Sequence, residues 1–236
     1  MPRTFSLADP AALDDLDTFV DRAGRIEEGA VRLIAGAGVL AAYAAALYPV
    51  GLTDETPTVL GLRTYAVDPD GEFFDAVVPI RSFLQRIESA RLRAAKAGSA
   101  ESSAAVPREP QVDVNLPMEV NTVTWAGISP PRGGWHATGE RPVELFRAAA
   151  ESGIAEMAGA VPDAVGEQLV RRARAEVWGR PIVGLEHIPA GAAFAQYSLG
   201  FLGDDLVRLY ESGPWSRLTT QRGHVLVKRR AWTLAR

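Results

Sequence analysis

The chain has 236 residues, of which 47% are hydrophobic and none is cysteine. This composition excludes general disorder and a membrane protein with several spans, and the missing cysteine excludes disulfides and thiolate chemistry. The formal net charge of −4 conceals a basic end, because residues 213–236 hold six Lys or Arg and no acid. That end could bind a polyanion, or it could dock on the acidic stretch at the start of the chain.

The first residues resemble neither a signal peptide nor a membrane anchor. Residues 1–28 contain seven acids and no apolar core segment. Residues 33–52 carry no charge and have the length of a membrane span, but only seven of them are Leu, Ile or Val. We interpret 33–52 as buried core and expect a cytoplasmic protein that does not contact a membrane.

The chain begins with a predicted helix and a predicted hairpin. Apolar residues at helical spacing indicate a helix over 11–26, with Asp9 as its N-cap and Pro10 in its first turn. Two apolar runs, 31–35 and 39–48, flank a glycine break and favour a hairpin, although the alanine content of the second run also suits a helix.

The strongest turn signal in the chain is Asp68-Pro69-Asp70-Gly71. Proline presets one backbone dihedral of such a turn, and glycine adopts the dihedral that other residues avoid. We therefore predict that 58–67 and 72–78 form a hairpin. An amphipathic, arginine-rich helix over 79–96 follows it.

A change of composition marks the expected domain boundary. Residues 97–117 are rich in Gly, Ser, Ala and Pro and have few apolar residues. Such a segment cannot bury enough apolar surface to offset the entropy of ordering it. We divide the chain into an N-terminal α+β subdomain (1–97), a flexible linker (98–117) and a C-terminal helical subdomain (118–236).

The second half predicts three helices and a closing β-hairpin. Proline begins two of the helices, and glycine punctuates the strands. The predicted elements are a short strand at 120–126, helices at 142–160, 162–178 and 190–202, and strands at 206–210, 214–220 and 224–230. Gln221-Arg222-Gly223 joins the last two strands.

Motifs of common enzyme classes are missing. The sequence has no G-x-S-x-G nucleophile elbow, no phosphate-binding loop and no H-E-x-x-H. His136, His187 and His224 lie far apart in sequence, so we expect no metal site.

A glycine pattern superficially suggests a dinucleotide cofactor. Gly36-x-Gly38-x-x-Ala41 with Asp54 downstream loosely matches a dinucleotide-binding fingerprint. However, Asp54 lies in a loop before the next strand, and a hairpin follows where a second βαβ unit is needed. We therefore expect no cofactor, and the motifs favour a protein that is not an enzyme.

Tryptophans coincide with cations in the second half. Indole faces with nearby guanidinium groups can hold a planar anionic ligand, although buried tryptophans with solvent-exposed arginines would give the same pattern. The candidate ligand-binding residues are Arg132, Trp135, His136, Trp178, Arg180, Trp215, Arg217, Arg222 and His224.

A nucleic-acid-binding interpretation rests on a basic helix and a basic hairpin. Both elements resemble the parts of a winged helix that contact phosphates. A helix intervenes between them, and the second half is only weakly basic, so we do not favour this interpretation. The cations concerned are Arg171, Arg172 and Arg174 in the helix, and Arg222, Lys228, Arg229 and Arg230 in the hairpin.

Five segments together resemble an uncharacterised family of actinobacterial proteins. They are V-L-G-L-R-T (59–64), P-R-G-G-W (131–135), V-W-G-R-P (177–181), A-A-F-A-Q-Y-S-L-G-F-L-G (192–203) and G-P-W-S-R-L-T-T-Q-R-G-H-V-L-V-K-R (213–229). The resemblance implies a bacterial cytoplasmic protein of unknown function. It brings no known activity, ligand or catalytic residue.

The sequence thus predicts an α+β fold with antiparallel-rich sheets and packed helices, possibly in two subdomains. The favoured function is a non-enzymatic, self-associating binding or regulatory protein with a small anionic ligand in a Trp/Arg-lined pocket. Two alternatives stay open. One is a nucleic-acid-binding regulator that uses the basic C-terminal hairpin, and the other is an enzyme that acts on a phosphorylated or carboxylated small molecule.

Overall fold

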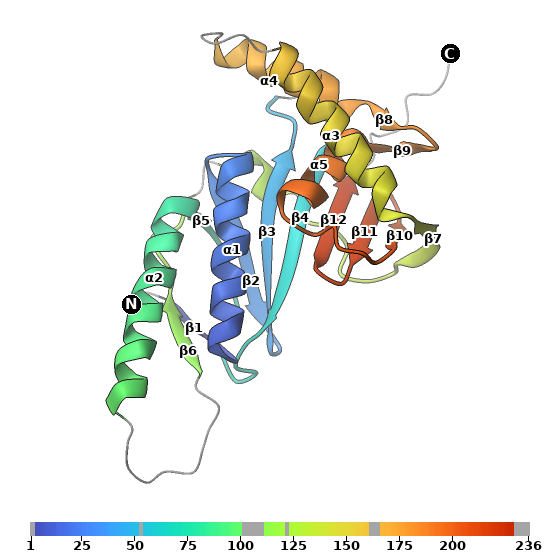
Figure 1. Ribbon diagram of the computed structural model, residues 1–236. Helices are drawn as coiled ribbons and strands as arrows, with labels where there is room; N and C mark the ends of the chain where they lie inside the picture. The colour runs from blue at the N-terminus through green and yellow to red at the C-terminus, as the bar shows by residue number, and fades with distance from the viewer. Residues whose placement is uncertain (1–2, 52–53, 101–110, 121–122, 161–165, 229–236) are drawn as a thin grey trace. The chain divides into compact units, whose positions relative to one another are not determined.

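The computed structural model describes residues 3–51, 54–100, 111–120, 123–160 and 166–228 (Figure 1). The chain forms two compact units, each assembled from two stretches of sequence. Unit 1 comprises residues 1–44 and 63–123, and unit 2 comprises residues 45–62 and 124–236. Among the helices of the described residues, none is long and apolar enough to cross a membrane.

Unit 1 combines two helices with antiparallel strands. Helix α1 packs against α2, and its apolar face, which includes Leu16, Phe19 and Val20, is buried. The elements are β1 (Thr4–Leu7), α1 (Pro10–Ile26), β2 (Ala30–Gly36), β5 (Phe74–Pro79), α2 (Ile80–Ala100) and β6 (Val112–Asn115), with the first part of β3 (Val39–Leu47) and the last part of β4 (Thr58–Ala66).

The start of α1 agrees with the prediction. The Asp9 carboxylate accepts a hydrogen bond from the backbone N–H of Ala12 at 2.7 Å, which satisfies one of the free donors of the first turn. Pro10 occupies the first turn, where its missing N–H costs nothing. The local signals therefore specify this helix boundary correctly.

The first predicted hairpin is confirmed. β2 pairs antiparallel with β3, from Gly36 opposite Val39 to Val31 opposite Ala44. Ala37 and Gly38, the two turn residues, have φ angles of 50° and 78°, as a tight hairpin turn that follows the strand twist requires. The alanine-rich second run is thus a strand and not a helix.

The second predicted hairpin is wrong, although its turn forms. The N–H of Gly71 donates to the carbonyl of Asp68 at 3.2 Å, so the chain does reverse there. Yet β5 pairs with β2, and residues 58–62 of β4 pair with β12 in unit 2. Turn residues specify the local reversal of the chain, whereas the strand partners are chosen by tertiary packing.

Unit 2 contains a sheet with helices on one face. Residues 58–62 of β4 pair with β12, β12 with β11, β11 with β10, and β10 with β7, all antiparallel. The elements are the 3₁₀ helix η1 (Thr124–Gly127), β7 (His136–Arg141), α3 (Val143–Ala160), α4 (Glu167–Gly179), β8 (Pro181–Ile182), β9 (Leu185–Pro189), α5 (Ala190–Ser198), β10 (Val207–Ser212), β11 (Trp215–Thr220) and β12 (Gly223–Lys228).

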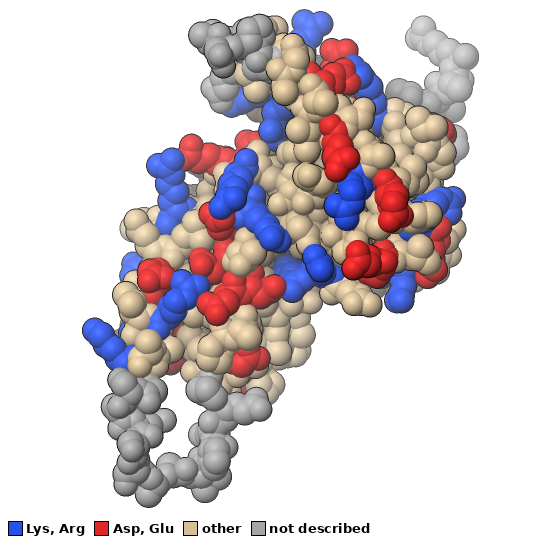
Figure 2. Space-filling model, in the orientation of Figure 1, with Lys and Arg blue, Asp and Glu red and all other residues tan. Residues whose placement is uncertain are grey.

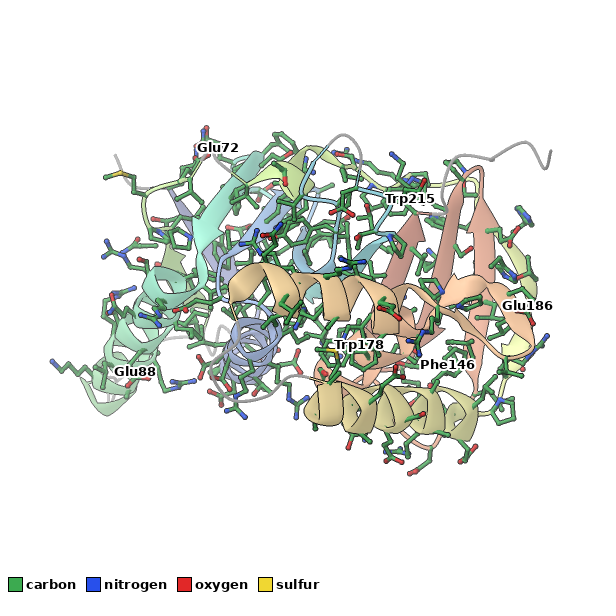
Figure 3. All side chains as sticks on the ribbon, turned by 90° about the horizontal axis from the view of Figure 1, so that it is seen from above. Glu72, Glu88, Phe146, Trp178, Glu186 and Trp215 are labelled. Carbon is green, nitrogen blue, oxygen red and sulfur yellow. The ribbon has the colours of Figure 1, made fainter. Side chains whose placement is uncertain are left out.

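Alternation along the strands separates the two faces of this sheet. Leu218 and Val225 belong to the face under the helices and are fully buried. Phe146 and Trp178 lie on that side in Figure 3, and Trp215 lies on the opposite side. We call this opposite side the open face because it is turned away from these helices; it carries Arg217, and two of its residues, Trp215 and Leu226, are nonetheless buried.

Several elements of unit 2 differ from the prediction. The strand expected at 120–126 is replaced in its last part by η1, and residues 121–122 lie outside the described chain. Helix α5 ends at Ser198 because Gly200 has a φ of 73°, and its N–H donates back to the carbonyl of Tyr197. The final hairpin, β11 with β12, forms as predicted.

Five short strands were not predicted, and the predicted linker is described only in part. Sequence reasoning missed β1, β6, β7 and the β8–β9 pair, which are too short or too polar for a periodic signal. Helix α2 continues to Ala100, and β6 pairs with β1. Residues 101–110 of the predicted linker lie outside the described chain, so the boundary there stays a prediction.

Candidate anion-binding site

Arg217 on β11 is the centre of the candidate site. Its guanidinium carbon lies 4.7 Å from the centroid of the Trp135 ring and 4.5 Å from that of the Tyr210 ring. Tyr210 is directly opposite Arg217 on the neighbouring strand β10, and Trp135 immediately precedes β7. Two cation–π contacts therefore hold one guanidinium on the open face.

Arg217 has no anionic partner among the residues that the structure describes. Its Nε is buried without a hydrogen-bond acceptor, and no ion pair joins it to a carboxylate. Burial lowers the pKa of Arg217 below its usual value, and the charge of Tyr210 opposes this shift only in part. A half-buried cation whose desolvation is not offset by a carboxylate favours the binding of an external anion.

The loop before β7 holds Trp135 in position. The indole Nε1 donates to the carbonyl of Pro131 at 3.2 Å. The hydroxyl of Ser212, at the end of β10, donates to the carbonyl of Gly133 at 3.3 Å. These two bonds attach the loop to itself and to the sheet, and they set the indole over Arg217. Arg132 lies in the same loop and is exposed.

The other predicted residues on the neighbouring strands do not all lie beside Arg217, because His136 shares the face of Glu211, opposite to the face of Tyr210 and Arg217. Trp215 is two residues before Arg217 on the same face and is buried. The Nδ1 of His224 is 3.0 Å from the hydroxyl of Thr219. His136 faces Glu211 on the neighbouring strand, and Arg222 is exposed at the hairpin turn. The sequence-predicted group therefore comes together only around Trp135 and Arg217.

Two predicted residues lie elsewhere in unit 2. Trp178 is 2% exposed and stacks on Phe194, with 4.3 Å between ring centroids. A side chain on Gly153 would meet its ring at 2.2 Å, so Trp178 belongs to the packed helical layer. The Arg180 guanidinium forms ion pairs with Glu156 and Glu176. Neither residue contributes to the site around Arg217.

Sequence reasoning missed Tyr210, although a signal for it existed. Gly213 and Pro214 form a two-residue connection between β10 and β11, so Ser212 must pair with Trp215. Counting back along both strands puts Tyr210 opposite Arg217. Predicting a hairpin over 206–220 would therefore have identified Tyr210 as the second aromatic neighbour of Arg217.

A metal site and a cavity in unit 1 were the other two kinds of site to consider in the described residues. In that part of the chain, no group of three or more His, Asp or Glu residues could hold a metal ion. Unit 1 has a cavity of about 480 Å³ at the end of α1, but the two arginines at its rim are paired. Arg25 pairs with Asp21, and Arg81 pairs with Glu28.

Comparison with solved structures finds bacterial clamp subunits. The DNA polymerase III subunit beta of Pseudomonas aeruginosa is 10% identical, with a TM-score of 0.44 over 100% of this chain and 66% of that one. That of Borrelia burgdorferi is 7% identical, with a TM-score of 0.49 over 98% and 65%. The sliding clamp of Bacillus subtilis is 10% identical, with a TM-score of 0.48 over 100% and 67%.

The chain thus spans about two thirds of the length of these clamp subunits. Because the TM-scores are below 0.5, nothing about the activity of this chain follows from them. No curated protein matches the sequence.

Family models match both ends of the chain and agree with the expected uncharacterised family. Residues 1–107 match a domain of unknown function (DUF8010). Residues 130–232, which include Arg217 and both of its aromatic neighbours, match a second one (DUF8185). Each model covers less than half of the chain, and the candidate site lies within the second match.

Proposed function

We propose that the protein is a non-enzymatic binding module in which the open face of unit 2 recognises an oxyanion through Arg217. The observation that supports this most is the half-buried guanidinium of Arg217, which has two aromatic contacts and no carboxylate partner in the described chain. An arginine kept on a sheet for stability alone would be expected to pair with an acid, as Arg32 on β2 does with Asp75 on β5.

The geometry favours an oxyanion over a neutral ligand. Aromatic rings attract the guanidinium charge, but they are weak hydrogen-bond acceptors. The N–H groups in the guanidinium plane therefore still need an acceptor. A phosphate or carboxylate can take two parallel N–H bonds from the terminal nitrogens of one arginine. Such a ligand would also offset the desolvation of Arg217, because it places a negative charge beside the guanidinium.

The alternative of nucleic-acid binding keeps its hairpin and part of its basic helix. Arg174 of the basic helix α4 donates to the carbonyl of Ala46 and lies over the Phe194 ring, so it takes part in packing. The hairpin of β11 and β12 is in place, with Arg222 at its turn and Lys228 at its end, both exposed. Arg171 and Arg172 of α4 are also exposed, whereas Arg229 and Arg230 lie outside the described residues.

Isothermal titration calorimetry of the full chain with inorganic pyrophosphate tests the proposal. We expect a saturable heat for the wild type, and at least a tenfold weaker affinity for Arg217→Met, because charge-assisted hydrogen bonds contribute about 1.5–3 kcal/mol. Arg180→Met is the matched control, since it removes the same charge from the helical layer. It should bind like the wild type.

Two results would contradict the proposal. One is a wild-type protein that gives no saturable heat with pyrophosphate. The other is an Arg217→Met variant that binds as tightly as the wild type while Arg180→Met binds more weakly. Circular dichroism of both variants shows whether each is folded before the titration is interpreted.

A further inference from the structure

We infer that the oxyanions recognised on the open face are the phosphates of a single-stranded nucleic acid that crosses β12, β11 and β10 diagonally. This inference rests on the proposed role of Arg217 and names the class of its ligand. Three cations on three neighbouring strands carry it. They are Lys228 on β12, Arg217 on β11 and Arg208 on β10.

Strand register places these three cations on the same face. Lys228 is opposite Trp215, two residues before Arg217, and Arg208 is opposite Thr219, two residues after it. Directly opposite residues share a face, and so do residues two apart on one strand. Lys228, Arg217 and Arg208 therefore form a diagonal line across the sheet, with Arg217 in the middle.

The spacing along this diagonal suits a linear polyanion. Diagonal neighbours on antiparallel strands are about 7–8 Å apart, and long Lys and Arg side chains adjust that distance. Lys228 and Arg208 are exposed. Glu140 on β7 lies 3.5 Å from the Arg208 Nε and is itself about half exposed, so this contact is weak and can yield to a phosphate.

The aromatic rings distinguish a nucleic acid from an acidic peptide. Trp135 and Tyr210 lie beside the middle cation, and both residues are only partly buried. Proteins that bind single strands combine a line of cations with aromatic rings on which the bases stack. An acidic peptide would use the cations but would gain nothing specific from two flat rings.

The same rings favour a single strand over a duplex. Bases in a duplex stack on one another and expose only their edges in the grooves, so an aromatic ring reaches a base face only where the strand is unpaired. A sheet face also presents its cations along a line, which a flexible single strand can follow.

Fluorescence anisotropy with a labelled oligothymidylate tests the inference. Each phosphate contact on a single strand contributes about −0.7 to the slope of log K against log salt, so the three cations predict a slope of −2 or steeper, measured between about 50 and 200 mM salt. Lys228→Ala and Arg208→Ala should each weaken binding several-fold and make the slope less steep by about 0.7. Arg172→Ala, on the exposed side of α4, is the matched control and should change neither quantity.

Each outcome separates the inference from the proposed function. If pyrophosphate binds in an Arg217-dependent manner and the oligothymidylate does not bind, the inference is wrong and the proposed function stands. Equal affinity for the matching duplex, or for a poly-glutamate of the same length, would also overturn the inference. If neither pyrophosphate nor the oligothymidylate binds, the inference and the proposed function both fail.

Discussion

Two arginines of unit 1 and Arg217 on the open face of unit 2 have opposite surroundings. In unit 1, Arg32 makes two hydrogen bonds to the carboxylate of Asp75, at 2.8 and 2.6 Å. Arg63 makes two bonds of 2.7 Å to Asp15. Figure 2 shows positive and negative side chains interleaved over the surface formed by α1 and α2. Arg217 in unit 2 has aromatic rings where these arginines have acids.

The two environments shift the pKa of arginine in opposite directions. The hydrogen bond to Asp75 raises the pKa of Arg32, whereas burial lowers that of Arg217. An arginine with its own carboxylate stabilises the fold and offers little to a ligand. An arginine without one is tolerated in the fold and retains its capacity to bind an external anion.

The acidic stretch at the start of the chain is largely neutralised within unit 1. Arg91 reaches two acids of α1, Asp14 and Asp17, and also pairs with Glu88 of α2. Asp15 and Asp21 pair with Arg63 and Arg25. These ion pairs satisfy most of the acids of α1 inside unit 1.

The largest expected effect separates the two tryptophans that sequence reasoning had grouped together. Trp178→Ala should lower the free energy of unfolding by about 3–5 kcal/mol, because it leaves a cavity in the helical layer. Trp135→Ala should lower it by less than about 1 kcal/mol and should weaken the affinity for pyrophosphate. Urea unfolding followed by circular dichroism measures the first quantity, and calorimetry measures the second. A larger stability loss for Trp135→Ala would reverse our assignment of the two residues.

A smaller effect distinguishes a paired arginine from an unpaired one. Arg32→Met should lower the free energy of unfolding by about 1–3 kcal/mol, because it leaves Asp75 without its partner. Arg217→Met should change it by no more than about 0.5 kcal/mol, since no described carboxylate loses a partner. Both values come from urea midpoints at neutral pH. Equal losses in the two variants would show that Arg217 also serves stability.

The smallest effect concerns the buried tyrosine of unit 1. Burial, with a further contribution from the charge of Asp15, raises the pKa of Tyr65 above its usual value of about 10. The unfolded chain therefore loses this proton first, and the free energy of unfolding should fall above about pH 10 by about 1.4 kcal/mol per pH unit. Tyr65→Phe removes this part of the decline and should change stability little near pH 7. Identical pH profiles for the two proteins would contradict a raised pKa.

The sequence predicted those parts of the fold that local signals determine. Asp9 and Pro10 specified the start of α1, and the glycine break at 36–38 specified the first hairpin. The strand that pairs with β5 could not be predicted, because the turn at 68–71 forms whichever strand β5 joins. Strand β7 was not predicted, because most of its residues are exposed and its sequence has no alternation of apolar and polar residues.

The candidate site could be predicted only in part, because the sequence signals are local and the site is formed by tertiary packing. The candidates chosen from the sequence included Arg217 and Trp135, which contact each other in the structure, but the sequence pattern placed Arg217 beside Trp215 and did not pair it with Trp135. The same pattern included Trp178 and Arg180, which the fold assigns to packing and to ion pairs. Local sequence does not distinguish a buried indole from a half-exposed one, because burial depends on which elements pack over it.

The most direct test of the Arg217 site observes its guanidinium. A ¹H–¹⁵N correlation spectrum resolves arginine Nε–H groups, and the signal missing from Arg217→Met identifies Arg217. On titration with pyrophosphate, we predict that this signal moves and saturates, while that of Arg180, already paired with Glu156 and Glu176, stays in place. A stationary Arg217 signal at pyrophosphate concentrations that shift other arginines would contradict the account.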